Sequence, residues 1–342
     1  MASSNRILIC PLDWGLGHAS RCIPIIKKYI NQGSEVIIAA DRRPLELLKQ
    51  EFPQLQFVKL SGYNISYAEN ISMTLQMIFS APKILWKIYI EHKKLNKIIN
   101  DHKIDMVISD NRYGLWNKNV KSIFMTHQIM IKSTEKLKFL EPILYGITKW
   151  FIKHYDECWI PDYEGKNNLS GDLSHKYPLP QNAKFIDPLS RFTSHLSLSI
   201  GIGEEQSILV LLSGPEPQRT VLENKIVDQL KQVRIKTIIV RGAPGLLEKL
   251  VVPDYVTVYS HLETDKMQQI ILDSNIIICR SGYSTIMDLA VFGKKAIFIP
   301  TTGQTEQEYL AKYHSNKGNS IYFKQDEFEL KKACDIFMLT YN

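Results

Sequence analysis

The sequence lacks the marks of a membrane-spanning, secreted or metal-binding protein. No segment of its 342 residues approaches the roughly 18 uninterrupted apolar residues that a membrane-spanning helix needs. The opening residues hold no long apolar stretch before Pro11 and Asp13, so we expect no signal peptide. No Asp-x-Asp pair occurs in the chain, which removes a common arrangement of carboxylates around a metal ion. We therefore expect no metal site.

Cysteine is scarce and is not arranged in pairs. The chain has five cysteines, an odd number, and none of them forms a Cys-x-x-Cys motif. Most stand within apolar runs, as buried thiols do in a reducing compartment. We therefore expect a cytoplasmic protein.

Acidic residues are fewer than basic ones, 35 against 42, which gives a net charge of +7. A moderately basic surface favours anionic partners such as phosphorylated metabolites or acidic lipids, although an ordinary soluble surface explains it equally well. The basic residues are dispersed among acidic ones and form no stripe, which argues against nucleic acid as a partner.

Short β-branched runs recur in two sets, and each run is followed by a helical or loop segment. Their nearly continuous apolarity indicates strands buried on both faces, and therefore parallel sheets covered by helices. We predict an α/β fold with two Rossmann-like domains, at 1–186 and 207–325, a linker at 187–206 and a closing helix at 326–342. Because such sheets bind ligands beyond the carboxyl ends of their strands, we expect the site in the cleft between the domains. The expected strands are 6–10, 35–40, 56–60, 105–109, 121–126, 157–160, 207–212, 236–240, 255–260, 275–280, 295–300 and 319–323.

The turn after the first expected strand reads LDWGLGHASR. Gly15 and Gly17 stand where a dinucleotide-binding fingerprint would begin, but Ser20 replaces its third glycine. Asp41 ends the second expected strand, where a ribose-binding acid would stand. A nicotinamide-dependent oxidoreductase is therefore an alternative for this turn.

His18 follows these glycines and would project into the cleft from the start of a helix. A histidine there could take a proton from an attacking hydroxyl group, because its pKa normally lies near working pH; capping the helix or packing on Trp14 is the alternative. Asp110, at the end of the fourth expected strand, could hold the histidine tautomer, or could cap a helix instead. His127 is a weaker second candidate for the base.

The second domain opens with a strand followed by Ser-Gly-Pro. Gly214 would let a phosphate approach the backbone and Arg219 could pair with that phosphate, although a simple turn explains the pattern equally well.

The strongest pattern is CRSGYSTIMDLAVFGKKAIFIPTTGQTEQEY, from Cys279 to Tyr309. A strand ends and a helix begins, and the free N–H groups of the helix start suit a diphosphate without a metal. A carboxylate one turn further on could accept ribose hydroxyl groups, and the later polar loop suits a sugar. An ordinary capped helix is the alternative. The residues of this candidate site are Arg280, Ser281, Gly282, Ser284, Thr285, Asp288, Gln304, Glu306 and Gln307.

These motifs resemble a known family. GLGH in the first turn, with CRSGYSTIMDLAVFGKKAIFIP and GQTEQEY, is similar to the GT-B glycosyltransferases that use nucleotide sugars, particularly the branch of the lipid-intermediate N-acetylglucosaminyltransferase of peptidoglycan synthesis. The resemblance implies a GT-B fold, a UDP-sugar donor bound mostly by the second domain, an acceptor bound by the first, and His18 as the base. It implies diphosphate binding at Ser281 to Thr285, ribose binding by Asp288, sugar binding by Gln307, and uracil binding by the backbone around His261 and Leu262.

Three features depart from the family pattern. Asp288 stands where the peptidoglycan enzyme has glutamate, Glu308 replaces the second of two glutamines, and the first turn has fewer glycines. These departures bear on the donor sugar and the acceptor rather than on the fold.

We therefore expect an inverting transfer of a sugar from a UDP-linked donor to a hydroxyl acceptor, without a metal or other cofactor. A nucleotide-sugar epimerase on the same fold, the oxidoreductase and a non-catalytic nucleotide-sugar sensor are the alternatives. Residues 67–99 mix aromatic, aliphatic and lysine side chains. They could lie on an anionic membrane and bring a lipid-linked acceptor to the site, or they could be helices packed on the sheet with their lysines in water.

Overall fold

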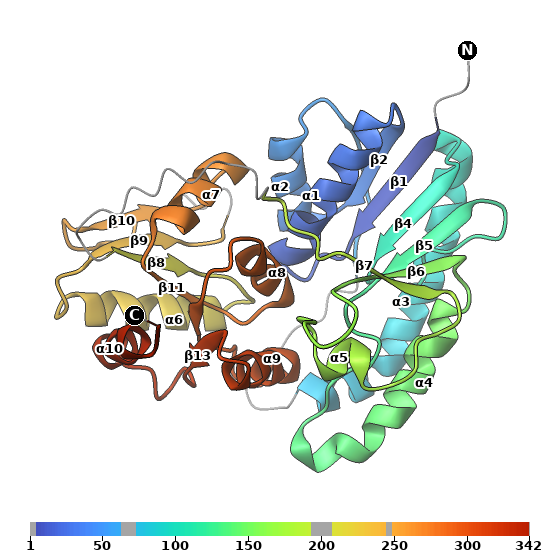
Figure 1. Ribbon diagram of the computed structural model, residues 1–342. Helices are drawn as coiled ribbons and strands as arrows, with labels where there is room; N and C mark the ends of the chain where they lie inside the picture. Colours follow the sequence, from blue (N-terminus) through green and yellow to red (C-terminus); the bar gives the residue numbers. More distant parts are fainter. Residues whose placement is uncertain (1–4, 63–72, 193–206, 244–247, 342) are drawn as a thin grey trace. The chain divides into compact units, whose positions relative to one another are not determined.

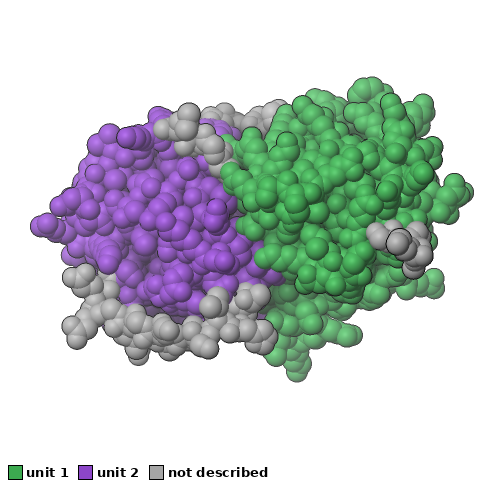
Figure 2. Space-filling model, turned by 90° about the horizontal axis from the view of Figure 1, so that it is seen from above, with its two compact units in different colours: residues 1–189 green, residues 190–342 purple. Residues whose placement is uncertain are grey.

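A computed structural model describes residues 5–62, 73–192, 207–243 and 248–341. The chain divides into two compact units, Met1–Leu189 and Ser190–Asn342 (Figure 2). Most of the expected linker, 193–206, and part of the stretch 67–99 lie outside the described residues.

Unit 1 is built on a seven-stranded sheet with the order β3-β2-β1-β4-β5-β6-β7, in which all neighbours are parallel (Figure 1). The strands are β1 Arg6–Pro11, β2 Glu35–Ala40, β3 Gln56–Lys59, β4 Met106–Asp110, β5 Lys121–Met125, β6 Glu157–Pro161 and β7 Ala183–Ile186. The helices are α1 Leu16–Asn31, α2 Arg42–Glu51, α3 Met73–His102, the 3-10 helix η1 Glu135–Leu140, α4 Glu141–Ile152 and α5 Asp172–His175.

Alternate residues of β1 enter two different cores, because successive side chains of a strand point to opposite faces of the sheet. Ile7 and Ile9 pack in the cluster that contains residues of α1 and α2. Leu8 and Cys10 pack on the opposite face in the cluster that contains Leu95 of α3. Both faces of the strand are therefore covered, which explains why its sequence is apolar throughout.

Unit 2 is built on a six-stranded parallel sheet with the order β10-β9-β8-β11-β12-β13. The strands are β8 Ser207–Leu211, β9 Lys236–Val240, β10 Val256–Tyr259, β11 Ile276–Cys279, β12 Ala296–Phe298 and β13 Ser320–Tyr322. The helices are α6 Gln218–Leu230, α7 Thr264–Asp273, α8 Tyr283–Val291, α9 Thr305–Asn316 and α10 Leu330–Tyr341.

The prediction of two parallel α/β sheets is confirmed. All twelve expected runs contain a strand, with boundaries that are either as expected or shifted by at most two residues. The strand β7 was not expected, because AKFI is too short to stand out from a loop. Of the helices that the structure describes, none combines the length and the apolarity needed to cross a bilayer.

Candidate functional site

In unit 1, the order of strands reverses between β1 and β4. These two strands are neighbours in the sheet, and Pro11 at the end of β1 lies opposite Asp110 at the end of β4. Ligands of open α/β sheets bind beyond the carboxyl ends of strands at such a reversal. The turn after β1 and the end of β4 therefore meet where a binding site is expected.

Gly15 shapes the turn that carries His18. Gly15 precedes the first residue of α1 and has a φ of 129°, a conformation that other residues rarely adopt. A Cβ atom there would meet nothing within 4 Å, so the backbone angle rather than space requires glycine. The turn puts His18 in the first turn of α1, where 16% of its side chain remains exposed.

The structure brings together His18 and Asp110, which are 92 residues apart in the sequence. Nδ1 of His18 lies 3.1 Å from Oδ2 of Asp110. Arg21, one helical turn after His18, donates from Nε to Oδ2 of Asp110 over 2.8 Å and from Nη2 to Oδ1. The Asp110 and Arg21 side chains are both buried, so this ion pair is shielded from water.

The Asp110 carboxyl is ionised at neutral pH. Burial acts to raise its pKa, but the charges of Arg21 and His18 and their hydrogen bonds outweigh burial and hold the pKa at about 2. Cys22 lies beside it, with Sγ 3.9 Å from Oδ2. Burial, and then the Asp110 charge, raise the pKa of this thiol well above its ordinary range, so Cys22 stays protonated.

Sequence reasoning missed Arg21. Its Nη2 lies 3.0 Å from Nδ1 of His18, and its Nη1 lies 2.9 Å from Nδ1 of His127, which follows β5. One guanidinium group therefore contacts two histidines and an aspartate from three different elements. The spacing of three residues between His18 and Arg21 was the available signal, because it puts both on one face of a helix.

In unit 2, the order of strands reverses between β8 and β11. Gly214 follows β8 with a φ of 104°, and a Cβ atom there would lie 3.5 Å from Oγ1 of Thr301, which follows β12. That Thr301 hydroxyl is buried and has no hydrogen-bond partner among the described residues. A backbone conformation that favours glycine and a buried hydroxyl group therefore lie next to each other after β8 and β12.

The start of α8 is tied to the start of α9. Ser281 donates its hydroxyl to the carbonyl of Gln307 over 2.7 Å. Oε1 of Gln307 in turn accepts from the N–H of Thr301 at 2.9 Å, and Glu308 accepts from the N–H of Gly303 at 2.9 Å. Gly282 precedes α8 and no side chain caps that helix start. The predicted diphosphate and sugar residues are therefore neighbours.

Arg280 is fully buried and contacts backbone carbonyls. It donates to the carbonyl groups of Ile299, Pro300 and Gln218 at 3.0, 3.2 and 2.8 Å. Burial lowers its pKa to about 10, and the side chain remains a cation at neutral pH. Arg280 therefore holds together loops after three strands rather than lining an open surface.

Arg219 is turned toward glutamates. It donates to Glu216 at 2.6 Å and to Glu223 at 3.1 Å, and Glu223 also accepts two bonds from the buried Arg241. Arg219 therefore pairs with two glutamates, one of which it shares with Arg241, and its binding of a phosphate stays a prediction.

Asp288 lies on α8 and accepts from the hydroxyl of Ser190 at 2.6 Å. Burial of its carboxyl group raises the pKa of Asp288 to about 6, against the charge of Arg191 and the bond from Ser190.

The predicted donor-site residues differ in exposure. Leu262 is buried, and six others are half-buried: His261, Ser284, Thr285, Gln304, Glu306 and Gln307. Within the described part of the chain, no group of three or more histidine, cysteine or acidic residues could hold a metal ion.

Two family models match separate parts of the chain. The Glycosyl transferase family 1 model matches residues 5–135, and the Glycosyltransferase family 28 C-terminal domain model matches residues 218–335. Among solved structures, the "Glycotransferase of kitacinnamycin" is 13% identical with a TM-score of 0.67, covering 99% of this chain and 91% of that one. The structure of Acinetobacter baumannii MurG is 12% identical with a TM-score of 0.57 and the same coverage. The chain is a GT-B glycosyltransferase.

Relatives of this glycosyltransferase match along most of its length. An "uncharacterized glycosyltransferase" of Methanosarcina acetivorans is 26% identical, over 89% of this chain and 81% of its own length. The "UDP-N-acetylglucosamine--N-acetylmuramyl-(pentapeptide) pyrophosphoryl-undecaprenol N-acetylglucosamine transferase" of Haemophilus ducreyi is 22% identical, over 97% of this chain and 89% of its own length. The matches do not favour the epimerase, oxidoreductase or sensor alternatives.

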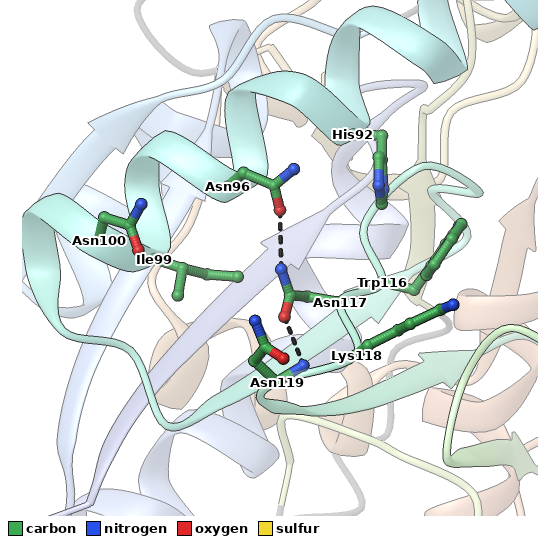
Figure 3. A pocket seen from close by; sticks show the side chains of 8 residues that line it. All are labelled: His92, Asn96, Ile99, Asn100, Trp116, Asn117, Lys118 and Asn119. Atoms are coloured by element: carbon green, nitrogen blue, oxygen red, sulfur yellow. Dashed lines mark hydrogen bonds between the residues drawn. The ribbon is translucent and has the colours of Figure 1, made fainter.

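The glycosyltransferase also has a pocket of about 510 Å³ that sequence reasoning did not predict (Figure 3). It lies between the second half of α3 and the loop before β5, near the amino ends of the strands, and so apart from His18 and Asp110. Asn117 donates to Asn96 across it at 2.7 Å. The lining residues are His92, Asn96, Ile99, Asn100, Trp116, Asn117, Lys118 and Asn119.

Proposed function

We propose that the enzyme transfers a sugar from a UDP-linked donor to a hydroxyl group of an acceptor, and that His18 is the base. The observation that carries the proposal is the contact of 3.1 Å between Nδ1 of His18 and the buried carboxylate of Asp110. A carboxylate at Nδ1 favours the tautomer in which Nε2 holds a lone pair. His18 is also partly exposed, so an acceptor can reach it.

The position of the proton on Nδ1 of His18 determines the proposed reaction, because it leaves the lone pair of Nε2 to accept a proton. Nε2 of His18 takes the proton of the acceptor hydroxyl as its oxygen attacks the anomeric carbon of the donor sugar. The bond from that carbon to the diphosphate oxygen breaks, and UDP leaves with the electron pair. Attack opposite the leaving group inverts the anomeric centre. Asp110 stabilises the imidazolium that forms.

We assign the donor to unit 2. The relative of Haemophilus ducreyi is named for UDP-N-acetylglucosamine, which supports a UDP-sugar for this chain. The start of α8, from Ser281 to Thr285, offers N–H groups and a positive dipole end to the diphosphate, and Thr301 and Gly214 adjoin the same edge of the sheet. These groups would stabilise the leaving charge without a metal ion. Arg280 acts on the site by fixing the loops around it.

Calorimetric titration with UDP, GDP, dTDP and NADH tests the donor assignment. Selective binding of UDP supports it. Tight binding of NADH without binding of any nucleoside diphosphate would overturn it in favour of a dinucleotide role for Gly15, Gly17 and Asp41. Product analysis with the UDP-sugar alone separates transfer from epimerisation, because only an epimerase converts the donor without an acceptor.

The affinity for UDP is expected to depend on Asp288 and on pH. The ionised carboxylate can accept hydrogen bonds from both ribose hydroxyl groups, and its pKa is about 6. Lowering the pH from 7.5 to 5 protonates the Asp288 carboxylate and should weaken its contribution to the affinity for UDP about tenfold. Because a terminal phosphate also titrates near pH 6, the measurement is the difference between the wild type and Asp288→Asn by calorimetry at each pH. Equal pH dependence in the two proteins would exclude Asp288 from nucleotide binding.

We propose that the acceptor is lipid-linked and that unit 1 contacts an anionic membrane at the cytoplasmic face. The helices α3 and α4 lie side by side in unit 1 (Figure 1), where Ile88 and Phe151 share a core cluster. Both helices leave large apolar side chains exposed next to exposed lysines, a pattern that suits lipid headgroups and acyl chains. The apolar residues are Leu85, Trp86, Tyr89, Ile143, Ile147 and Trp150, and the lysines include Lys83, Lys93, Lys94 and Lys153.

The double variant Trp86→Glu/Trp150→Glu is expected to lose binding to vesicles of phosphatidylglycerol and phosphatidylcholine in a flotation assay. It replaces two exposed aromatic anchors, 62% and 57% accessible, with charges that anionic lipids repel. Leu339→Glu is the matched control, because Leu339 is 88% exposed on unit 2 and should leave binding unchanged. Equal flotation of the double variant and the wild type would refute the assignment of this face.

A further inference from the structure

Arg21 binds Asp110 through two bonds and reaches a histidine on each side. Nε and Nη2 hold the two carboxylate oxygens, Nη1 lies 2.9 Å from Nδ1 of His127, and Nη2 lies 3.0 Å from Nδ1 of His18. Arginine carries five N–H donors in a rigid plane and no acceptor. Each contact therefore restricts where the proton of the neighbouring group can be.

The contact with His127 requires Nδ1 of that histidine to be an acceptor. Because Arg21 can only donate, neutral His127 must carry its proton on Nε2. His127 is then a hydrogen-bond donor at Nε2 and has no lone pair there with which to take a proton. This excludes His127 as the base at Nε2, although its position after β5 made it a candidate.

For His18, the contact with Asp110 rather than the contact with Arg21 favours the opposite tautomer. Oδ2 of Asp110, which Arg21 holds in place, lies within 3.1 Å of Nδ1 and can accept its proton. Nη2 of Arg21 lies 3.0 Å from the same nitrogen and carries a second N–H besides the one donated to Oδ1 of Asp110, so the guanidinium and the carboxylate compete for Nδ1 of His18. Only the bond to Asp110 survives when Nε2 takes a proton, because both ring nitrogens then carry hydrogen.

We propose that Arg21 is a positioning residue that gives the two histidines opposite tautomers, with the proton on Nδ1 in His18 and on Nε2 in His127. His18 is thereby the base and His127 a donor to a bound substrate. This inference rests on the proposed role of His18, but it concerns proton positions that can be measured without any substrate.

Side-chain ¹⁵N spectra of the histidines in the whole chain, at a pH where they are neutral, test the proposal. The wild type should show His18 protonated at Nδ1 and His127 at Nε2. Arg21→Lys keeps a cation beside Asp110 but cannot bind both oxygens and His127 together. In this variant the Nδ1 proton of His18 should shift toward Nε2. The rate of UDP release from UDP-N-acetylglucosamine, with glycerol as the hydroxyl acceptor, should fall about 100-fold with the KM for the donor unchanged.

Arg112→Lys is the matched control, because Arg112 is another buried arginine of unit 1, paired with Glu91 at 2.6 Å and bonded to neither histidine. It should leave both histidine spectra as in the wild type. An unchanged His18 tautomer in Arg21→Lys overturns the proposal. If Arg21→Lys does not fold, the wild-type spectrum still decides, since a proton on Nδ1 of His127 or on Nε2 of His18 contradicts it. Correct tautomers without UDP release from any UDP-sugar would instead count against the proposed function alone.

Discussion

His18→Ala is expected to lower the rate of glycosyl transfer at least 100-fold, on the order of what a general base contributes, while UDP binding persists. The base and the proposed donor site lie in different units, so truncating His18 removes the proton acceptor and leaves the nucleotide contacts in place. The measurement is the initial rate of transfer together with the Kd for UDP by calorimetry.

His102→Ala serves as the control for this experiment. His102 ends α3, and its backbone carbonyl, which the substitution keeps, accepts from Arg6 at 3.1 Å. Its loss should leave the rate unchanged. Loss of both transfer and UDP binding in His18→Ala would remove the base assignment, because a base on unit 1 has no reason to hold the nucleotide.

Asp110→Asn is expected to lower both activity and stability. The amide is neutral and leaves the buried Arg21 guanidinium without a counter-charge, which typically costs 3–5 kcal/mol, so we expect a loss of about 3 kcal/mol in the free energy of unfolding. It also removes the charge that holds the proton on Nδ1 of His18, and transfer should fall by a factor on the order of 10³ to 10⁴. Urea unfolding and initial rates measure the two effects.

The pH dependence of stability distinguishes the Asp110 charge from packing. Its pKa lies at about 2 in the folded chain, below the ordinary value of 3.8. The stabilisation is therefore fully present above pH 4 and is lost as the pH falls from 4 toward 2, by about 2 kcal/mol. Asp110→Asn should show a correspondingly shallower loss between pH 4 and pH 2. Parallel curves for the two proteins would mean that the carboxylate is not stabilised by Arg21.

The strands could be predicted from the sequence because strands buried on both faces read as apolar runs. Runs such as EVIIAA, which forms β2, leave little choice of structure. The order of the strands in the sheets could not be predicted, because the sequence of a strand does not indicate which other strand lies beside it. Because β1 lies beside β4, His18 reaches Asp110. Because β8 lies beside β11, Gly214 lies toward the start of α8.

The sequence drew attention to residues that end a strand or begin a helix, and it gave less indication of the side chains that pack between them. The sequence pointed to His18 and Asp110 because each stands at the end of a strand or the start of a helix. Arg21 was not among the residues predicted for the site, and its side chain is buried at 1% exposure. Arg219 was predicted to be a phosphate ligand, and its pairing with Glu216 before α6 and Glu223 on α6 could not be read from the sequence.

The buried cysteines make the enzyme convenient to label. All five are free and buried, and burial raises the pKa of Cys10 and Cys334 to about 12 and that of the other three thiols well above the ordinary range. Maleimides react with exposed thiolates, so the native chain should stay almost unmodified. A cysteine introduced at the exposed Thr302, in the loop between β12 and α9, would carry a single fluorophore beside the proposed nucleotide loops and, if the proposal holds, report UDP binding in real time.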